Sequence, residues 1–112
     1  MEAKLPSGNL LENIPPRTAP ESINELLSHP GVRIERIVSH GHASPDGFWY
    51  DQDDDEWVAV ITGEAELLIE GEPAPRELER GDWVFLPAHC RHRVVRTATG
   101  RPTVWLAVRL KP

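Results

Sequence analysis

After residue 31, short hydrophobic segments rich in β-branched and aromatic residues are separated by polar turns. Such segments are typical of half-buried β-strands. Each is bounded by turn-forming residues, and no long helical pattern separates them, which argues against parallel βαβ units. The expected strands are 32–39, 48–52, 56–61, 64–70, 82–87, 92–97 and 103–110. Short strands at this regular spacing predict an all-β sandwich or barrel.

The first 31 residues have a different pattern. Residues 1–17 read as an irregular arm that packs on the body or on a second subunit. The next segment predicts one short helix, because Thr18 and Glu21 have the spacing of a capping box. Ile23, Leu26 and Leu27 would form its apolar stripe. We therefore expect a single domain with an N-terminal arm and helix, 1–31, followed by the β-barrel, 32–112.

Composition narrows the possible partners. The chain has 112 residues and a net charge of −6, which disfavours binding to nucleic acid. Its longest uninterrupted apolar stretches have five residues, far short of a membrane span. A single cysteine excludes an intrachain disulfide, and the N-terminal sequence lacks the pattern of a secretion signal. We expect a cytoplasmic protein whose partner is a small molecule, with no nucleic acid and no membrane.

One strand carries a carboxylate towards the interior. Glu56, Val58 and Val60 share one face of the strand by alternation, and this face is otherwise apolar. A buried carboxylate is costly unless it is paired, hydrogen-bonded or bound to a metal. The alternative is that Glu56 is simply the last residue of a solvated acidic turn, DDDE.

Glu56 is followed after six residues by Gly63, and Gly81 is followed after five by Pro87 and then by His92. These two patterns, 17 residues apart, resemble the two signature motifs of the cupin superfamily, and the closest likeness is to small single-domain bacterial cupins. The resemblance implies a small antiparallel β-barrel of the jelly-roll or double-stranded β-helix type. It also implies a homodimer and a metal site that includes Glu56 and His92.

The chain departs from the cupin pattern at the other metal ligands. The usual His-x-His pair before the glutamate is replaced by Tyr50, Asp51 and Gln52, so Gln52 is the positional substitute for a histidine. His42 and His89 are further candidates to complete the set. Any of these sets would suit one divalent transition metal, and iron, manganese, nickel and zinc are not distinguished. In the alternative interpretation, Gln52 is an ordinary strand amide and both histidines lie in surface loops.

Two functions follow from these residues. The first is a metal-dependent enzyme that acts on a small anionic molecule, with Tyr50 as acid or base. Cupins include dioxygenases, isomerases, cyclases and lyases, so the resemblance leaves the reaction open. The second is a non-catalytic binding or sensor module that uses the same cavity, with or without metal. A local cluster of arginines favours an anionic ligand in either case: Arg91, Arg93, Arg96 and Arg101.

Overall fold

A computed structural model describes residues 5–111, and all of the regular elements in this part of the chain are β-strands. None of the described residues forms a helix that is long and apolar enough to cross a membrane. Every strand pairing is antiparallel, so the predicted all-β class is confirmed. The strands are β1 (Ser22–His29), β2 (Val32–Ser39), β3 (Asp55–Thr62), β4 (Glu64–Ile69), β5 (Arg76–Glu79), β6 (Trp83–Leu86), β7 (His92–Thr97) and β8 (Thr103–Leu110).

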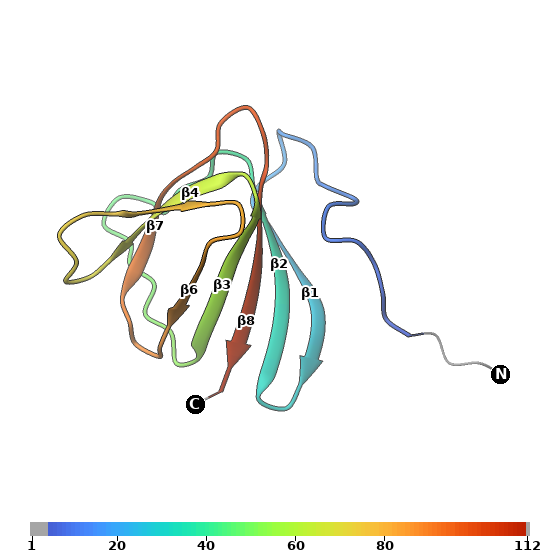
Figure 1. Cartoon of the computed structure of the whole chain (residues 1–112), viewed down its shortest axis with the longest axis horizontal. Coiled ribbons are helices and arrows are strands. Elements are labelled where there is room, and N and C mark those ends of the chain that lie inside the picture. The colour runs from blue at the N-terminus through green and yellow to red at the C-terminus, as the bar shows by residue number, and fades with distance from the viewer. Residues whose placement is uncertain (1–4, 112) are drawn as a thin grey trace.

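The strands form two sheets that face each other (Figure 1). The larger sheet has the order β1-β2-β8-β3-β6, and the smaller sheet has the order β5-β4-β7. Apolar side chains from both sheets fill the space between them, including Val60 and Trp105 from the larger sheet and Leu67 from the smaller one. β8 lies in the middle of the larger sheet, between β2 and β3, although it is the last strand along the chain.

The predicted short helix is wrong, because residues 22–29 form the edge strand β1. Only Pro30 and Gly31 separate β1 from β2, so the tight turn brings this segment directly alongside β2. Pairing with a sheet outweighs a weak local preference for helix. The spacing of Ile23, Leu26 and Leu27 resembles a helical stripe, and in the structure the strand contains a register shift between Glu25 and Leu27.

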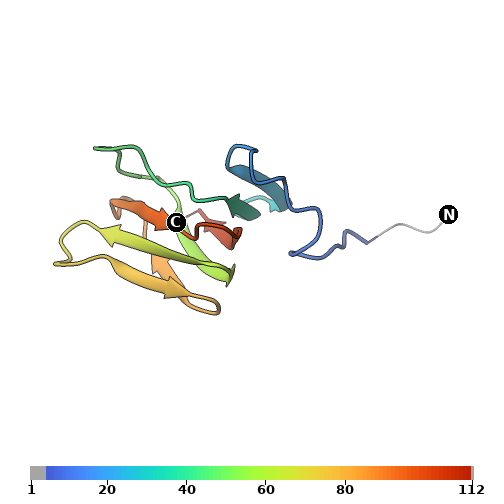
Figure 2. The same ribbon diagram turned by 90° about the horizontal axis from the view of Figure 1, so that it is seen from above.

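Hydrogen bonds to β2 and to His40, which follows β2, anchor the arm before β1. The guanidinium of Arg36 donates hydrogen bonds to the backbone carbonyls of Leu10, Glu12 and Asn13. From Leu10 towards residue 5, the arm runs away from the sheets beyond β1 (Figures 1 and 2). Further along the arm, the carbonyl of Pro15 lies 2.8 Å from Nε2 of His40, and the Glu21 carboxylate accepts a hydrogen bond from the hydroxyl of Ser39. The arm therefore contacts the larger sheet from Leu10 to Glu21.

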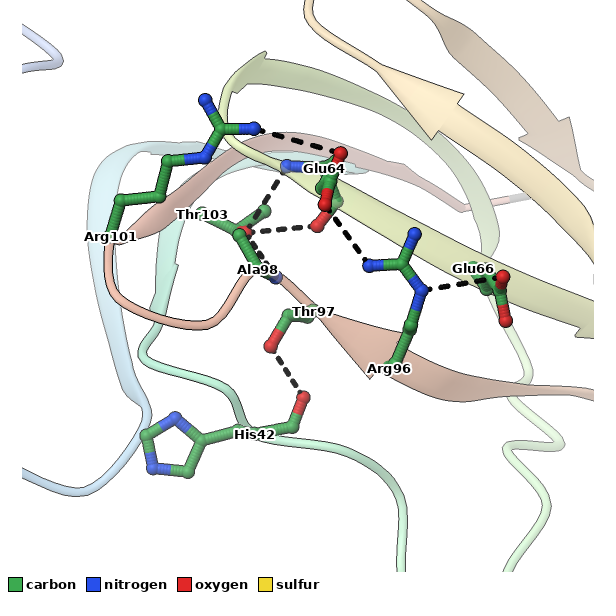
Figure 3. A network of polar contacts seen from close by, with 8 residues as sticks. All are labelled: His42, Glu64, Glu66, Arg96, Thr97, Ala98, Arg101 and Thr103. Atoms are coloured by element: carbon green, nitrogen blue, oxygen red, sulfur yellow. Dashed lines mark hydrogen bonds and ion pairs between the residues drawn. The ribbon is translucent and has the colours of Figure 1, made fainter.

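Gly63 forms the turn between β3 and β4 at a point where the chain is tightly packed. Its φ is +87°, and the buried Thr103 lies directly against it. The Thr103 hydroxyl donates to the carbonyl of Glu64 at 3.0 Å and accepts from the amide of Ala98 at 3.1 Å (Figure 3). This network joins the β3–β4 turn to the start of β8.

Candidate functional site

The two sheets enclose a cavity of about 90 Å³, which has room for several water-sized groups. Much of its wall is apolar, with Val58, Leu67 and Trp105 among the lining residues. Six polar side chains also reach it: Glu21, Tyr50, Gln52, Glu56, His92 and Arg109. A largely apolar cavity with a few convergent polar groups is the usual form of a small-molecule site.

Glu56 and His92 meet in this cavity from opposite sheets. Glu56 is the second residue of β3, and His92 is the first residue of β7. Both are buried, and the Nε2 atom of His92 lies 3.8 Å from the Oε1 atom of Glu56. The predicted interior position of Glu56 is therefore confirmed, and the role of the pair as metal ligands stays a prediction.

The orientation of His92 is fixed by its neighbours. Its Nδ1 atom lies 2.9 Å from the carbonyl oxygen of Cys90, and because a carbonyl only accepts, Nδ1 carries the hydrogen. In the neutral imidazole, Nε2 is then the unprotonated nitrogen, and it faces Glu56. The ring also stacks on Tyr50, with centroids 5.2 Å apart and an angle of 22°. The backbones of Tyr50 and His92 form an isolated antiparallel bridge that holds the two rings together.

Tyr50 keeps its proton at neutral pH. Burial is the main reason that the pKa of this phenol is raised above its ordinary value of 10.0, and the negative charges of Glu21 and Glu56 raise it further. Arg109 acts in the opposite direction but does not cancel these effects. The phenol is therefore a hydrogen-bond donor inside the cavity.

Arg109 was not identified from the sequence, although it is the cation of the site. In the register of the larger sheet it lies directly opposite Glu56, and its Nη2 atom is 3.5 Å from the Oε2 atom of that residue. Its Nε atom donates to Glu35 at 2.7 Å. Burial opposes its charge, but these two carboxylates outweigh that effect, so the pKa of Arg109 is raised. Alternation with Trp105 along β8 is the sequence signal that places Arg109 on the inner face.

The structure does not bring His42 or His89 to the cavity. The His42 ring accepts a hydrogen bond from the amide of His40, and its carbonyl accepts one from Thr97 near the β3–β4 turn (Figure 3). The His89 side chain is 65% exposed, and its Nδ1 atom lies 2.7 Å from Asp51. This hydrogen bond raises the pKa of His89. Neither histidine is among the residues that line the cavity, because each is held by partners outside it.

The predicted arginine cluster is also not part of the site. Arg91 pairs with Glu70, and Arg96 and Arg101 pair with Glu64. Arg93 donates to backbone carbonyls of the 44–45 turn. None of these four arginines is among the residues that line the cavity.

The donor set of the cavity fits a metal ion with three protein ligands. His92 supplies a nitrogen, Glu56 a carboxylate and Gln52 an amide oxygen, a combination of types that binds divalent transition metals. Among residues 5–111 there is no group of three His, Cys, Asp or Glu side chains that would hold a metal without such an amide. Gln52 lines the cavity with Glu56 and His92, and its role as a third ligand stays a prediction.

Comparison with known proteins assigns the fold. Residues 36–109 match the family model of the cupin domain. The chain is a cupin. The described structure is also similar to a double-stranded β-helix cupin of the RmlC-like family from Methanocaldococcus jannaschii, with a TM-score of 0.71 and 17% identity. The match covers 99% of this chain and 93% of the other. The predicted jelly-roll architecture is thus confirmed.

One similar structure is also close in sequence. It is a protein of Ralstonia eutropha JMP134 provisionally named a mannose-6-phosphate isomerase, with a TM-score of 0.92 and 51% identity. The match covers 95% of this cupin and 98% of the other chain. A cupin superfamily protein of Desulfitobacterium hafniense DCB-2 is 20% identical with a TM-score of 0.74, covering 100% and 94%. No curated protein matches this cupin in sequence.

Proposed function

We propose that this cupin binds one divalent transition metal ion through His92, Glu56 and Gln52, and that it acts on a small molecule in the barrel cavity. The observation that carries the proposal is the 3.8 Å distance between Nε2 of His92 and Oε1 of Glu56. This distance is too long for a hydrogen bond. It is shorter than the sum of two metal–ligand bonds of about 2.0–2.2 Å each, so an ion fits between the two atoms.

The charges of the cavity also favour a cation. Glu21 and Glu56 each contribute a carboxylate to the lining, whereas Arg109 contributes the one guanidinium and shares it with Glu35. The lining is therefore negative overall when His92 is neutral. A divalent ion would make the lining positive overall and give an anionic ligand a positive group to bind.

A bound metal would act as a Lewis acid that polarises an oxygen atom of the small molecule. The protein's own residues would then orient that molecule and exclude water. Tyr50 would donate a hydrogen bond or a proton, because its raised pKa keeps the phenol protonated. Leu67, Leu86 and Trp105 would pack against the apolar part of the molecule.

A phosphorylated sugar, the substrate class in the name of the Ralstonia relative, fits this cavity poorly. A phosphate dianion needs cationic or multiple N–H partners. Among the lining residues, Arg109 is the one lysine or arginine, and it is already bound to Glu35 at 2.7 Å. We therefore propose an unphosphorylated molecule whose carboxylate or hydroxyl oxygen binds the ion.

The second candidate is a non-catalytic binding module without metal. It is favoured by the 3.5 Å contact between Arg109 and Glu56, which already gives the buried carboxylate a counter-charge. In this case the small molecule would bind directly to Tyr50, Gln52 and His92.

Elemental analysis of protein purified without a histidine tag separates the two candidates. The metal-dependent function predicts about one transition metal ion per chain, lost in His92→Ala and in Gln52→Leu while far-UV circular dichroism is unchanged. The matched control is His89→Ala, which removes an exposed histidine from outside the cavity and should keep the metal.

Two results would contradict the metal site. Metal retained in His92→Ala would remove this residue from the site. A metal-free wild type that carries an organic molecule, detected by mass spectrometry of the native protein, would favour the binding module instead.

A further inference from the structure

Glu21 is a second carboxylate of the cavity, and the register of β1 and β2 explains its position. Ile23 of β1 pairs with Ile37 of β2, and both side chains line the cavity. Because side chains alternate along a strand, continuing this register by two residues places Glu21 opposite Ser39 on the same inner face. The Glu21 carboxylate indeed accepts a hydrogen bond of 2.5 Å from the Ser39 hydroxyl.

The bond to Ser39 fixes the Glu21 carboxylate and leaves it free to bind a ligand as well. Ser39 is fully buried, so the hydroxyl that donates to the Oε2 atom of Glu21 has a fixed position. A carboxylate has acceptor sites for roughly four hydrogen bonds, so the Ser39 bond occupies one of several. Glu21 lines the cavity and is also exposed to solvent, which places it where the cavity opens.

Glu21 lies apart from the proposed metal ligands. Among residues 5–111, no three His, Cys, Asp or Glu side chains are placed to hold a metal ion, so Glu21 does not form such a group with Glu56 and His92. Its neighbour is Tyr50, because the negative charge of Glu21 raises the pKa of this phenol more than that of Glu56 does. The cavity therefore has two polar ends, Glu56 with His92 at one and Glu21 at the other. Tyr50, which stacks on His92, connects them.

A hydroxyl group matches the end of the cavity formed by Glu21 and Tyr50. An ionised carboxylate only accepts hydrogen bonds, whereas a protonated phenol can donate one. A hydroxyl can donate to Glu21 and accept from Tyr50 at the same time. A carboxylate or phosphate would be repelled by the charge of Glu21, and an ammonium group could not accept the bond from Tyr50.

We propose that Glu21 and Tyr50 form a subsite for a hydroxyl group, and that the molecule bound in the cavity is a small hydroxy acid. Its carboxylate would bind the ion held by Glu56 and His92, so this inference rests on the function proposed above. Its hydroxyl would lie at the other end of the cavity. Glu21 would then select the hydroxy acid over the same acid without the hydroxyl, because that analogue leaves the polar groups of the subsite unpaired.

Calorimetric titration of the metal-loaded protein tests the subsite. The probes are three pairs of acids that differ only in a terminal hydroxyl: glycolate and acetate, 3-hydroxypropionate and propionate, and 4-hydroxybutyrate and butyrate. All are short, because the cavity of about 90 Å³ holds only a few water-sized groups. For at least one pair, the wild type should bind the hydroxy acid about tenfold or more tightly than the plain acid, as expected of a hydrogen bond to a charged group.

The variant Glu21→Leu should lower this preference at least about fivefold, keep the metal, and bind the plain acid no more weakly than the wild type does. A hydroxyl that also touches the ion would do so in both proteins, so the change in preference isolates the contact with Glu21. The matched control is Glu12→Leu, which removes an exposed carboxylate of the same arm and should keep the preference. Tyr50→Phe removes only the phenolic hydroxyl and should also lower the preference, so the test remains decisive if Glu21→Leu does not fold.

Two results would overturn the subsite. One is a metal-loaded wild type that prefers none of the three hydroxy acids. The other is a preference that stays unchanged in every folded variant of Glu21 and Tyr50. Either result leaves the metal site of Glu56 and His92 intact, because metal content is measured separately. A wild type that contains no metal and binds none of the acids would instead refute the proposed function, and this inference with it.

Discussion

Replacing Gly63 with alanine tests how tightly the β3–β4 turn is packed. An ideal Cβ at this position would lie 2.6 Å from the Cα and Oγ1 atoms of Thr103 and 2.7 Å from the carbonyl oxygen of Pro102. Two of these three atoms belong to the backbone, so no side-chain rotation relieves the clash. The backbone would also have to keep a φ of +87°, which alanine adopts at a cost.

Gly71 provides the matched control, because it shares the backbone conformation and lacks the neighbours. Its φ is +92°, and no heavy atom lies within 4 Å of an ideal Cβ. Gly71→Ala should therefore cost only the positive φ, about 1–2 kcal/mol, less about 0.4–1 kcal/mol recovered from the unfolded chain. Gly63→Ala adds the overpacking, so its total should reach about 2–4 kcal/mol.

Urea unfolding followed by circular dichroism measures both values. The two variants and the wild type must be compared at one protein concentration, because dimerisation would add to the apparent stability. We expect the midpoint of Gly63→Ala to fall well below that of Gly71→Ala, with similar slopes. Equal losses in the two variants would refute the steric reasoning and leave only the backbone conformation as a cause.

Two further predictions concern the cavity. Arg109→Met should destabilise the protein by about 3–5 kcal/mol in urea unfolding, because the buried Glu35 and Glu56 lose their cation. The control Arg76→Met breaks the exposed ion pair of Arg76 with Glu72 and should cost much less. Equal costs would contradict the buried network. Tyr50 is the only tyrosine, and its tyrosinate absorbance should titrate with a midpoint above 10.0. Since the folded state holds the Tyr50 proton more tightly, this proton contributes fully to the free energy of unfolding below the unfolded pKa. The contribution is lost as pH rises through the folded pKa. A midpoint at or below 10.0 would rule out the burial effect.

The residues that face the inside of the barrel could be predicted where the alternation within a single strand determines their direction. Alternation along 56–60 placed Glu56 and Val58 inside, and the spacing from Pro87 to His92 matched a cupin motif. Gln52 lines the cavity as its position before Glu56 suggested. These features depend on periodicity within a segment, which the sequence contains directly.

The features that were missed depend on pairing between distant segments. Arg109 meets Glu56 only because β8 lies beside β3, and no local pattern states this register. The helix predicted around Ile23 failed for the same reason, since β2 captures this segment as a strand. His42 and His89 are predicted from proximity along the chain, and in the structure they bond to His40 and Asp51 instead of lining the cavity.

The central place of β8 has a consequence for how the protein folds. Until this last strand enters between β2 and β3, each of those strands has an unpaired edge that can pair with another chain. Arg109 arrives with the same strand, so Glu56 has no positive partner during that interval. Completion of the larger sheet and neutralisation of the interior carboxylate therefore both require β8. Conditions that slow the entry of β8 should favour aggregation of the nascent chain.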